Sequence, residues 1–211
     1  MDRQCDVSYD SGMNPRLKTA HSSLIVMALK SESQGVFEAA GIDVLYCGVG
    51  KVNAAIALTR ELGRITGSGR DAPLVLNFGT AGCRRHGAGS LVACHEFVQR
   101  DMDASGLGFA PGVTPFEDAP ARLQFEPCFL DLPAAVCGTG DSFETGAWRG
   151  EYDVVDMEAY ALAKVCRSFD APFGCVKYVS DAADEAAAAD WQGNQHRAAA
   201  DFLSLYRRIS G

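Results

Sequence analysis

Short apolar segments alternate along this chain with segments in which apolar residues recur at helical spacing. The apolar segments predict strands at residues 24–29, 42–47, 74–76, 90–98, 135–138 and 174–179. Helical spacing is found in residues 34–40, 51–62, 159–166 and 198–209. Strands that alternate with helices are typical of an α/β fold with at least a partly parallel sheet.

Glycine, proline and serine mark the expected connections between these segments. Residues 63–70 are predicted to form a loop, residues 79–82 a glycine turn, and residues 104–122 a long irregular loop. No internal repeat or linker divides the chain of 211 residues. We therefore expect one domain over residues 24–211, preceded by a polar and loosely ordered arm over residues 1–23.

The charge balance excludes several kinds of partner. Lys and Arg number 19 and Asp and Glu 27, which gives a formal net charge of −8. Binding to the phosphate backbone of nucleic acid needs a basic surface, and anionic membranes attract basic segments. The apolar run at residues 24–29 is too short to span a bilayer, and the polar segment before it does not have the pattern of a signal peptide. We expect a cytoplasmic protein that binds neither nucleic acid nor membrane.

Eight cysteines are scattered along the sequence, and none forms a C-x-x-C pair. Zinc sites need clustered ligands at short spacing, so no metal site is predicted. Because no secretion signal is recognised, we expect buried thiols rather than disulfides.

Two glycine-rich segments follow predicted strands. Residues 48–51 (GVGK) differ from a phosphate-binding P-loop, because Val52 stands where that motif needs Ser or Thr. They also lack the third glycine of the dinucleotide-binding pattern. Residues 79–82 (GTAG) would allow a ligand to approach the backbone closely. Residues 48–51 are explained either by a tight turn that lets the helix pack on the sheet or by a ligand that lies against the backbone, and residues 79–82 alone are a weak signal.

Three carboxylic acids stand at predicted ends of strands or starts of helices, and these are Glu32, Glu158 and Asp181. In open α/β sheets, ligands bind beyond the carboxyl ends of the strands. Helix capping and favourable charge at a helix start explain Glu158 and Asp181 equally well. Taken alone, none of the three establishes a catalytic site.

Taken together and in order, these motifs resemble a known superfamily. Residues 154–159 (VVDMEA) and 176–181 (VKYVSD) resemble the C-terminal signature of the nucleoside phosphorylase/nucleosidase superfamily. Residues 48–55, 77–82 and 140–143 (GDSF) resemble segments of its 5′-methylthioadenosine/S-adenosylhomocysteine nucleosidases. The resemblance covers about residues 24–210. It implies a single α/β domain with a mixed, partly barrel-like sheet flanked by helices, as in purine nucleoside phosphorylases, and a homodimer.

The same resemblance implies roles for individual residues. Glu32 matches the carboxylate that activates water, and Asp181 matches the acid that protonates the purine, with Ser180 setting its position. Met157 and Glu158 match a sugar-binding pair in which Glu158 accepts hydrogen bonds from the ribose hydroxyls. The other expected contacts to the substrate are Ala28, Val49, Thr80 near the ribose, Phe143 stacked on the purine, and Glu144, whose backbone would meet the purine edge. Residues expected to reach into the site of a partner subunit are Ala104, Leu107 and Phe109.

The chemistry that this set could perform is cleavage of an N-glycosidic bond without metal or organic cofactor. One carboxyl group would protonate the leaving base, and a separate one would activate water. Phosphorylases of the superfamily hold phosphate with an Arg at the position of Asn77, so hydrolysis is favoured over phosphorolysis. A phosphorylase and a nucleoside-binding protein without catalysis are the alternatives.

Departures from the family pattern leave the substrate open. The segment between Glu32 and residue 42 is too short for a hairpin usual in the family. Lys177 stands where the nucleosidases often have Arg, and Glu144 replaces an apolar residue at the purine edge. The partner is therefore expected to be a purine nucleoside whose base and 5′ substituent are not specified.

Overall fold

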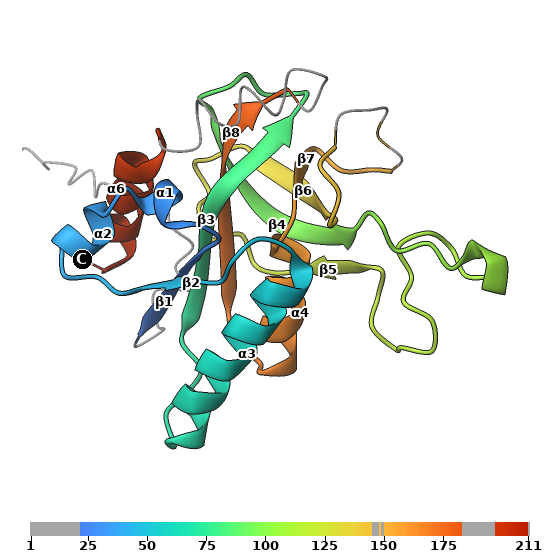
Figure 1. Cartoon of the computed structure of the whole chain (residues 1–211), viewed down its shortest axis with the longest axis horizontal. Helices are drawn as coiled ribbons and strands as arrows, with labels where there is room; N and C mark the ends of the chain where they lie inside the picture. The colour runs from blue at the N-terminus through green and yellow to red at the C-terminus, as the bar shows by residue number, and fades with distance from the viewer. Residues whose placement is uncertain (1–21, 145–147, 149, 183–196, 211) are drawn as a thin grey trace, which may run out of the picture.

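The computed structural model describes residues 22–144, 148, 150–182 and 197–210 (Figure 1). The strands are β1 Ser23–Met27, β2 Val44–Tyr46, β3 Leu74–Cys83, β4 Leu91–Gln99, β5 Arg122–Gln124, β6 Ala134–Thr139, β7 Val154–Asp156 and β8 Phe173–Asp181. The α-helices are α1 Lys30–Ser33, α2 Val36–Ala39, α3 Lys51–Gly67, α4 Ala159–Ser168 and α6 Ala199–Ser210, and a 3-10 helix covers Ser105–Leu107.

All of these strands belong to one sheet, ordered β2-β1-β3-β7-β6-β4-β5. Strand β8 pairs with both β3 and β4, in parallel with β3 and antiparallel to β4, and so joins two strands that are separated in that order. Strands β3, β7, β6, β4 and β8 therefore close into a ring, while β1 and β2 extend the sheet beyond it. The mixed, partly barrel-like α/β sheet predicted from the resemblance is confirmed.

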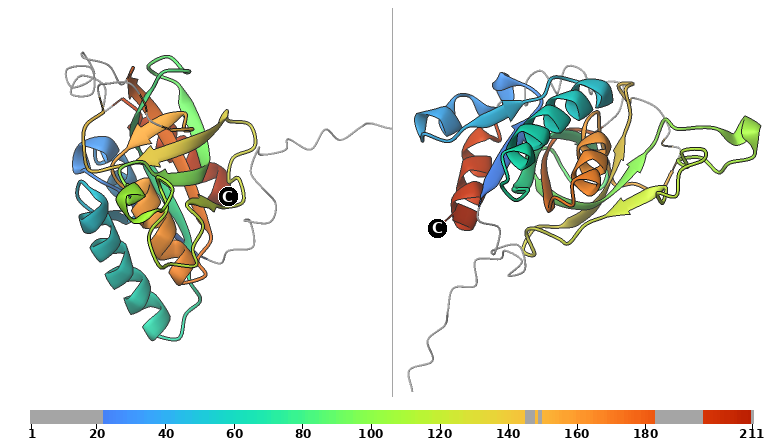
Figure 2. Two further views of the ribbon diagram at one scale, coloured as in Figure 1. Left: turned by 90° about the vertical axis from the view of Figure 1, so that its right-hand side faces the viewer. Right: turned by 90° about the horizontal axis from the view of Figure 1, so that it is seen from below.

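Helices cover the sheet on two sides (Figures 1 and 2). On one side, α3 packs against α4, and their apolar faces contribute Leu58, Leu62 and Leu162 to the larger buried cluster. On the other side, α2 and α6 pack against the strands, and the rings of Phe78 and Phe202 stack with centroids 5.1 Å apart. The catalytic candidates lie near the carboxyl ends of β1, β3 and β8.

The predicted end of helix α3 is wrong. Residues 63–70 were expected to be a loop, but α3 continues to Gly67. Leu62 and Ile65 are both buried, so the helical spacing of apolar residues extends past Gly63. A glycine in a helix costs only about 1 kcal/mol relative to alanine, and this packing offsets that cost.

The predicted glycine turn at residues 79–82 is also wrong. Strand β3 runs through these residues to Cys83 and stays paired with β8, with one irregularity between Ala81 and Gly82. A Cβ atom on Gly79 would lie 3.2 Å from Lys177 Nζ and 3.3 Å from Glu32 Oε1. Position 79 is thus glycine because the charged side chains of Lys177 and Glu32 leave no room for a larger side chain, and not because the chain turns there.

Several other expectations have clear outcomes. Residues 104–121 are irregular apart from the 3-10 helix, Arg122 begins β5, and the segment projects away from the barrel (Figure 1). The seven cysteines in the described part of the chain are buried free thiols, as expected.

Residues 1–21 of the expected arm lie outside the described residues. Among the described helices, none is long and apolar enough to cross a membrane, and the cytoplasmic location stays a prediction.

Candidate active site

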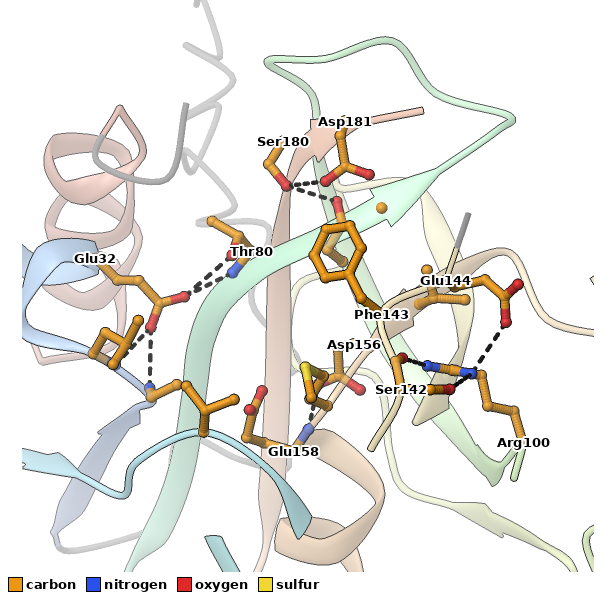
Figure 3. Close-up of a pocket in the computed structure, with 17 residues that line it drawn as sticks. Glu32, Thr80, Arg100, Ser142, Phe143, Glu144, Asp156, Glu158, Ser180 and Asp181 are labelled. Atoms are coloured by element: carbon orange, nitrogen blue, oxygen red, sulfur yellow. Dashed lines mark hydrogen bonds and ion pairs between the residues drawn. The ribbon is translucent and has the colours of Figure 1, made fainter. Parts of the chain in front are cut away.

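A cavity of about 280 Å³ opens at the carboxyl ends of β1, β3 and β8 (Figure 3). The residues predicted from sequence to be catalytic or to bind substrate all line it, namely Ala28, Glu32, Val49, Thr80, Phe143, Glu144, Met157, Glu158, Ser180 and Asp181. The rest of its lining is Leu29, Ala81, Gly82, Arg100, Ser142, Val155 and Asp156, and of these only Ala81 and Gly82 were placed near a possible ligand from the sequence. Seven separate stretches of the sequence therefore meet around one cavity.

The three residues predicted to serve a partner subunit lie elsewhere. Ala104, Leu107 and Phe109 belong to the projecting segment and do not line the cavity of their own chain. The side chain of Leu107 is 71% exposed, and that of Phe116 further along the segment is 92% exposed. This placement leaves their apolar surface available to another molecule.

Glu32 is buried and held on both carboxylate oxygens. Its Oε2 accepts hydrogen bonds from the N–H groups of Ala28 and Leu29, each at 3.0 Å. Its Oε1 accepts from the Thr80 N–H at 3.1 Å and from the Thr80 hydroxyl at 3.3 Å. Burial raises the pKa of Glu32, while the Leu29 N–H, the charge of Lys177 and Thr80 oppose that shift. The result is an oriented carboxyl group whose proton affinity is increased, which suits a general base.

Asp181 ends β8 and is buried beside Ser180. The Ser180 hydroxyl donates to Asp181 Oδ2 at 2.7 Å and also lies 3.3 Å from the carbonyl oxygen of Ala81. A hydroxyl has one proton, so it serves one of these acceptors at a time. The 2.7 Å contact joins the two side chains directly and fixes the position of the Asp181 carboxyl group at the end of β8.

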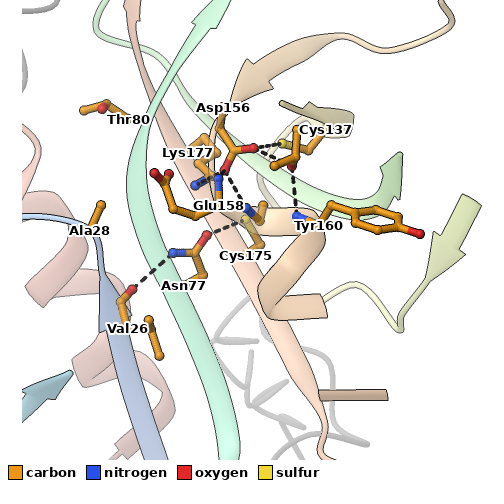
Figure 4. Close-up of polar contacts among 12 residues, drawn as sticks. Val26, Ala28, Asn77, Thr80, Cys137, Asp156, Glu158, Tyr160, Cys175 and Lys177 are labelled. Atoms are coloured by element: carbon orange, nitrogen blue, oxygen red, sulfur yellow. Dashed lines mark hydrogen bonds and ion pairs between the residues drawn. The ribbon is translucent and has the colours of Figure 1, made fainter. Parts of the chain in front are cut away.

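A buried ion pair lies beneath the cavity (Figure 4). Asp156 Oδ2 is 2.9 Å from Lys177 Nζ, and both side chains are almost fully buried. Burial alone would raise the pKa of Asp156, but Lys177 and the Thr139 hydroxyl hold it below its usual value. Burial alone would lower the pKa of Lys177, but Asp156 brings it well above its usual value. Both groups are therefore charged at neutral pH.

Glu158 begins α4 without capping it through its side chain. Burial, followed by the negative charge of Asp156, raises the pKa of Glu158 to about 8, against the opposing effects of Lys177 and the Gly50 N–H. The capping role considered from the sequence falls to Asp156 instead, whose Oδ2 accepts from the Ala159 N–H at 2.8 Å. A carboxyl group with this pKa can carry a proton near neutral pH, and it then donates as well as accepts a hydrogen bond.

Two N–H groups at the start of α3 are bound to carboxyl groups of the protein itself. The Gly50 N–H donates to Glu158 Oε1 at 2.9 Å, and the Lys51 N–H donates to Asp141 Oδ1 at 2.8 Å. Helix N-termini bind anions through such N–H groups. Here two carboxyl groups of the protein accept hydrogen bonds from two of these N–H groups. This favours internal contacts at the start of the helix as the reason for the glycine-rich sequence of residues 48–51.

Asn77 is buried in the barrel and contributes nothing to the cavity wall (Figure 4). Its Nδ2 donates to the carbonyl oxygen of Val26 at 3.2 Å, and the Cys175 thiol donates to its Oδ1 at 3.4 Å. These contacts tie β1, β3 and β8 together. The amide at this position therefore acts as a structural link between strands.

Comparisons with known proteins agree with this fold. Residues 34–210 match the Phosphorylase superfamily. A 5′-methylthioadenosine/S-adenosylhomocysteine nucleosidase of Anoxybacillus flavithermus is 31% identical over 80% of this chain and 79% of its own length. One of Geobacillus thermodenitrificans is 32% identical over 76% and 75%. The chain thus belongs to the phosphorylase superfamily, and the resemblance inferred from its motifs is confirmed.

Solved structures share the architecture at lower identity. A Helicobacter pylori 5′-methylthioadenosine/S-adenosylhomocysteine nucleosidase with butyl-thio-DADMe-Immucillin-A superposes with a TM-score of 0.77 at 20% identity, covering 91% of this chain and 98% of that one. A native futalosine hydrolase of Helicobacter pylori gives a TM-score of 0.76 at 20% identity, covering 90% and 97%. At this identity the two structures support the fold alone.

Proposed function

We propose that this protein hydrolyses the N-glycosidic bond of a purine nucleoside such as methylthioadenosine or adenosylhomocysteine, with Asp181 as acid and Glu32 as base. The observation that carries the proposal is the position of these two carboxyl groups on different sides of one cavity (Figure 3). The relatives that exceed 30% identity are nucleosidases by name. A glycosidic-bond hydrolase is the enzyme class that fits both the family and the cavity.

The proposed reaction assigns each carboxyl group one task. Cleavage passes through a sugar with oxocarbenium character and leaves electrons on the base. Asp181 protonates the departing purine, and Ser180 then stabilises the resulting carboxylate through its hydroxyl. Glu32 takes a proton from the attacking water. Glu158 binds the ribose hydroxyls, and its ionised form stabilises the positive charge that develops on the sugar.

Three features of the cavity favour water over phosphate as the nucleophile. Asn77 is turned into the barrel, and the Gly50 and Lys51 N–H groups at the start of α3 are bound to Glu158 and Asp141. Arg100 is the one cationic residue among the described residues that line the cavity, and its guanidinium is bound to Ser142 and Glu144. A phosphate ion in this cavity would be repelled by its carboxylates and would lack a guanidinium group available to bind two of its oxygens.

We expect release of free purine from at least one nucleoside at the same rate with and without added phosphate. The measurement follows the free base by chromatography for methylthioadenosine, adenosylhomocysteine, adenosine, inosine and a nucleoside with a bulky aromatic 5′ group. Release that depends strictly on phosphate would support a phosphorylase instead. Binding of a nucleoside without release of base would support a catalytically silent binding protein.

The projecting segment supports a second part of the proposal, which is a homodimer. Leu107 and Phe116 expose apolar side chains on it, and Val49 and Phe143 expose apolar surface at the mouth of the cavity. Exposed apolar patches are typical of association sites. The segment of one subunit is proposed to cover the mouth of its partner's cavity, which would bring Ala104, Leu107 and Phe109 near the 5′ substituent.

Leu107→Asp is therefore expected to shift the protein from dimer to monomer in sedimentation velocity and to raise KM for the nucleoside by about tenfold, because a charge would be buried at the interface. The matched control is Leu130→Asp, since Leu130 is 59% exposed on a different connection. Leu130→Asp should leave assembly and KM unchanged. A wild-type protein that sediments as a monomer at micromolar concentration contradicts the dimer.

A further inference from the structure

Arg100 directly follows β4 and points into the wall of the cavity, where its side chain is only 5% exposed. Its Nη1 donates to the Ser142 hydroxyl and to Glu144 Oε2, each at 3.1 Å. Its Nη2 donates to the carbonyl oxygens of Gly140, at 3.4 Å, and Ser142. One guanidinium thus binds three residues of the segment that follows β6.

Gly140 leaves room for this arrangement. A Cβ atom at position 140 would lie 2.9 Å from Arg100 Cζ and 3.1 Å from Arg100 Nε. Such contacts are shorter than any ordinary van der Waals approach, so the guanidinium lies directly against the bare backbone of Gly140. The glycine is needed for close packing here, because its φ is not in the left-handed region.

The segment that Arg100 holds carries Phe143 into the cavity. Residues 142–144 have no helical or strand pairing of their own, and the side chain of Phe143 is 47% exposed. Figure 3 shows the Phe143 ring beneath Asp181, with Arg100 on the far side of the segment from that acid. An irregular segment with few backbone partners is free to move unless side chains fix it.

Glu144 supplies the charge that fixes the guanidinium. Its carboxylate is directed to Arg100, and the pair is largely removed from solvent. A charge-assisted bond of this kind is stronger than a neutral hydrogen bond, and the planar guanidinium can bind carbonyl, hydroxyl and carboxylate groups at once. The pairing also explains how an acidic residue is accommodated at this wall without presenting a net charge to a neutral ligand.

We propose that Arg100 is a positioning residue that fixes residues 140–144 in the shape that presents Phe143 to the purine base, with Glu144 as its anchor. The inference rests on the proposed function for the identity of the ligand. It concerns affinity for the base rather than the chemical step, because Arg100 is bound to the segment and not to Glu32 or Asp181.

The test uses the full-length protein with Arg100→Ala, Arg100→Lys and Gly140→Ala. The last variant displaces the guanidinium from the other side. We expect all three to raise KM for the nucleoside by about tenfold or more while kcat changes less than about threefold, since a charged hydrogen-bonding group is lost or displaced. Lysine should not restore KM, because it lacks the planar fork. Glu144→Gln should give a smaller rise in KM.

A second measurement does not depend on catalysis. Hydrogen exchange of the amides in peptides covering residues 139–144 is measured without ligand, and we expect it to be faster in all three variants than in the wild type. The matched control is Arg122→Ala, because Arg122 pairs with Glu96 at 2.6 Å and does not line the cavity. Arg122→Ala should change neither exchange nor KM.

The outcomes separate this inference from the proposed function. A rise in KM with unchanged exchange would mean that Arg100 contacts the substrate itself, and it would overturn the positioning role. Faster exchange with unchanged KM would overturn the link to base binding. If the wild type releases no base from any nucleoside, the proposed function fails, while exchange and nucleoside affinity from calorimetry still decide the role of Arg100.

Discussion

Asp181→Asn is expected to reduce the rate of base release by about 10²- to 10⁴-fold, the usual contribution of a positioned general acid. The amide keeps the shape of the side chain and its contact with Ser180, whose hydroxyl lies 2.7 Å from Asp181 Oδ2. It has no acidic proton to give to the purine. Substrate affinity should change little, because the cavity wall is otherwise intact. Rates come from single-turnover assays, and affinity comes from calorimetry.

Two further variants make this prediction specific. Ser180→Ala removes the hydroxyl partner but leaves the acid, so its rate should fall between those of the wild type and Asp181→Asn. Asp201→Asn changes an exposed carboxylate on α6 and should have no effect. If Asp181→Asn keeps the wild-type rate, Asp181 is not the acid and the assignment must move to another carboxyl group of the cavity.

The second large effect is expected on stability. Lys177→Met should lower the free energy of unfolding by about 3–5 kcal/mol, because it leaves the buried carboxylate of Asp156 without its cation. The Nζ–Oδ2 distance is 2.9 Å, and each side chain is 1% exposed. Urea unfolding followed by circular dichroism measures the change.

The control for this prediction is an ion pair at the surface. Lys164 lies 2.6 Å from Glu117, but both side chains are more than a third exposed, so Lys164→Met should cost at most about 1 kcal/mol. The double variant Lys177→Met/Asp156→Asn should recover part of the loss. A Lys177→Met protein as stable as Lys164→Met would show that the buried pair does not stabilise the fold.

The local pattern of apolar and acidic residues was sufficient to predict several buried strands and much of the cavity lining. Apolar runs correctly indicated the buried strands β1 and β4, and strand-end acids such as Glu32 and Asp181 line the cavity. Pattern failed where a residue's partner is distant in sequence. Gly79 was predicted to belong to a turn because glycine is common in turns. Its glycine is instead explained by the side chains of Lys177 and Glu32, which lie too close for a Cβ atom.

Arg100 and Asp156 show the same limit within the site. Nothing around Arg100 in the sequence indicates that its guanidinium binds residues 140–144, because that contact depends on the parallel pairing of β4 with β6. Asp156 was part of a recognised motif, but its role as the anion of Lys177 depends on strands β7 and β8 meeting across the ring. Both ionic contacts depend on which strands lie next to or opposite each other in the sheet, and local sequence does not reveal this.

The occupied start of α3 has a consequence for the choice between nucleosides and nucleotides. A phosphorylated sugar carries a charge of about −1.5 to −2 at pH 7 and needs several hydrogen-bond donors to enter a protein site. The Gly50 and Lys51 N–H groups are already bound to Glu158 and Asp141, so the electrostatic potential at this helix end is reduced. A cell contains many adenine nucleotides at high concentration. A cavity beside a helix start that already binds two carboxyl groups of the protein can discriminate against them and still admit the uncharged sugar of a nucleoside.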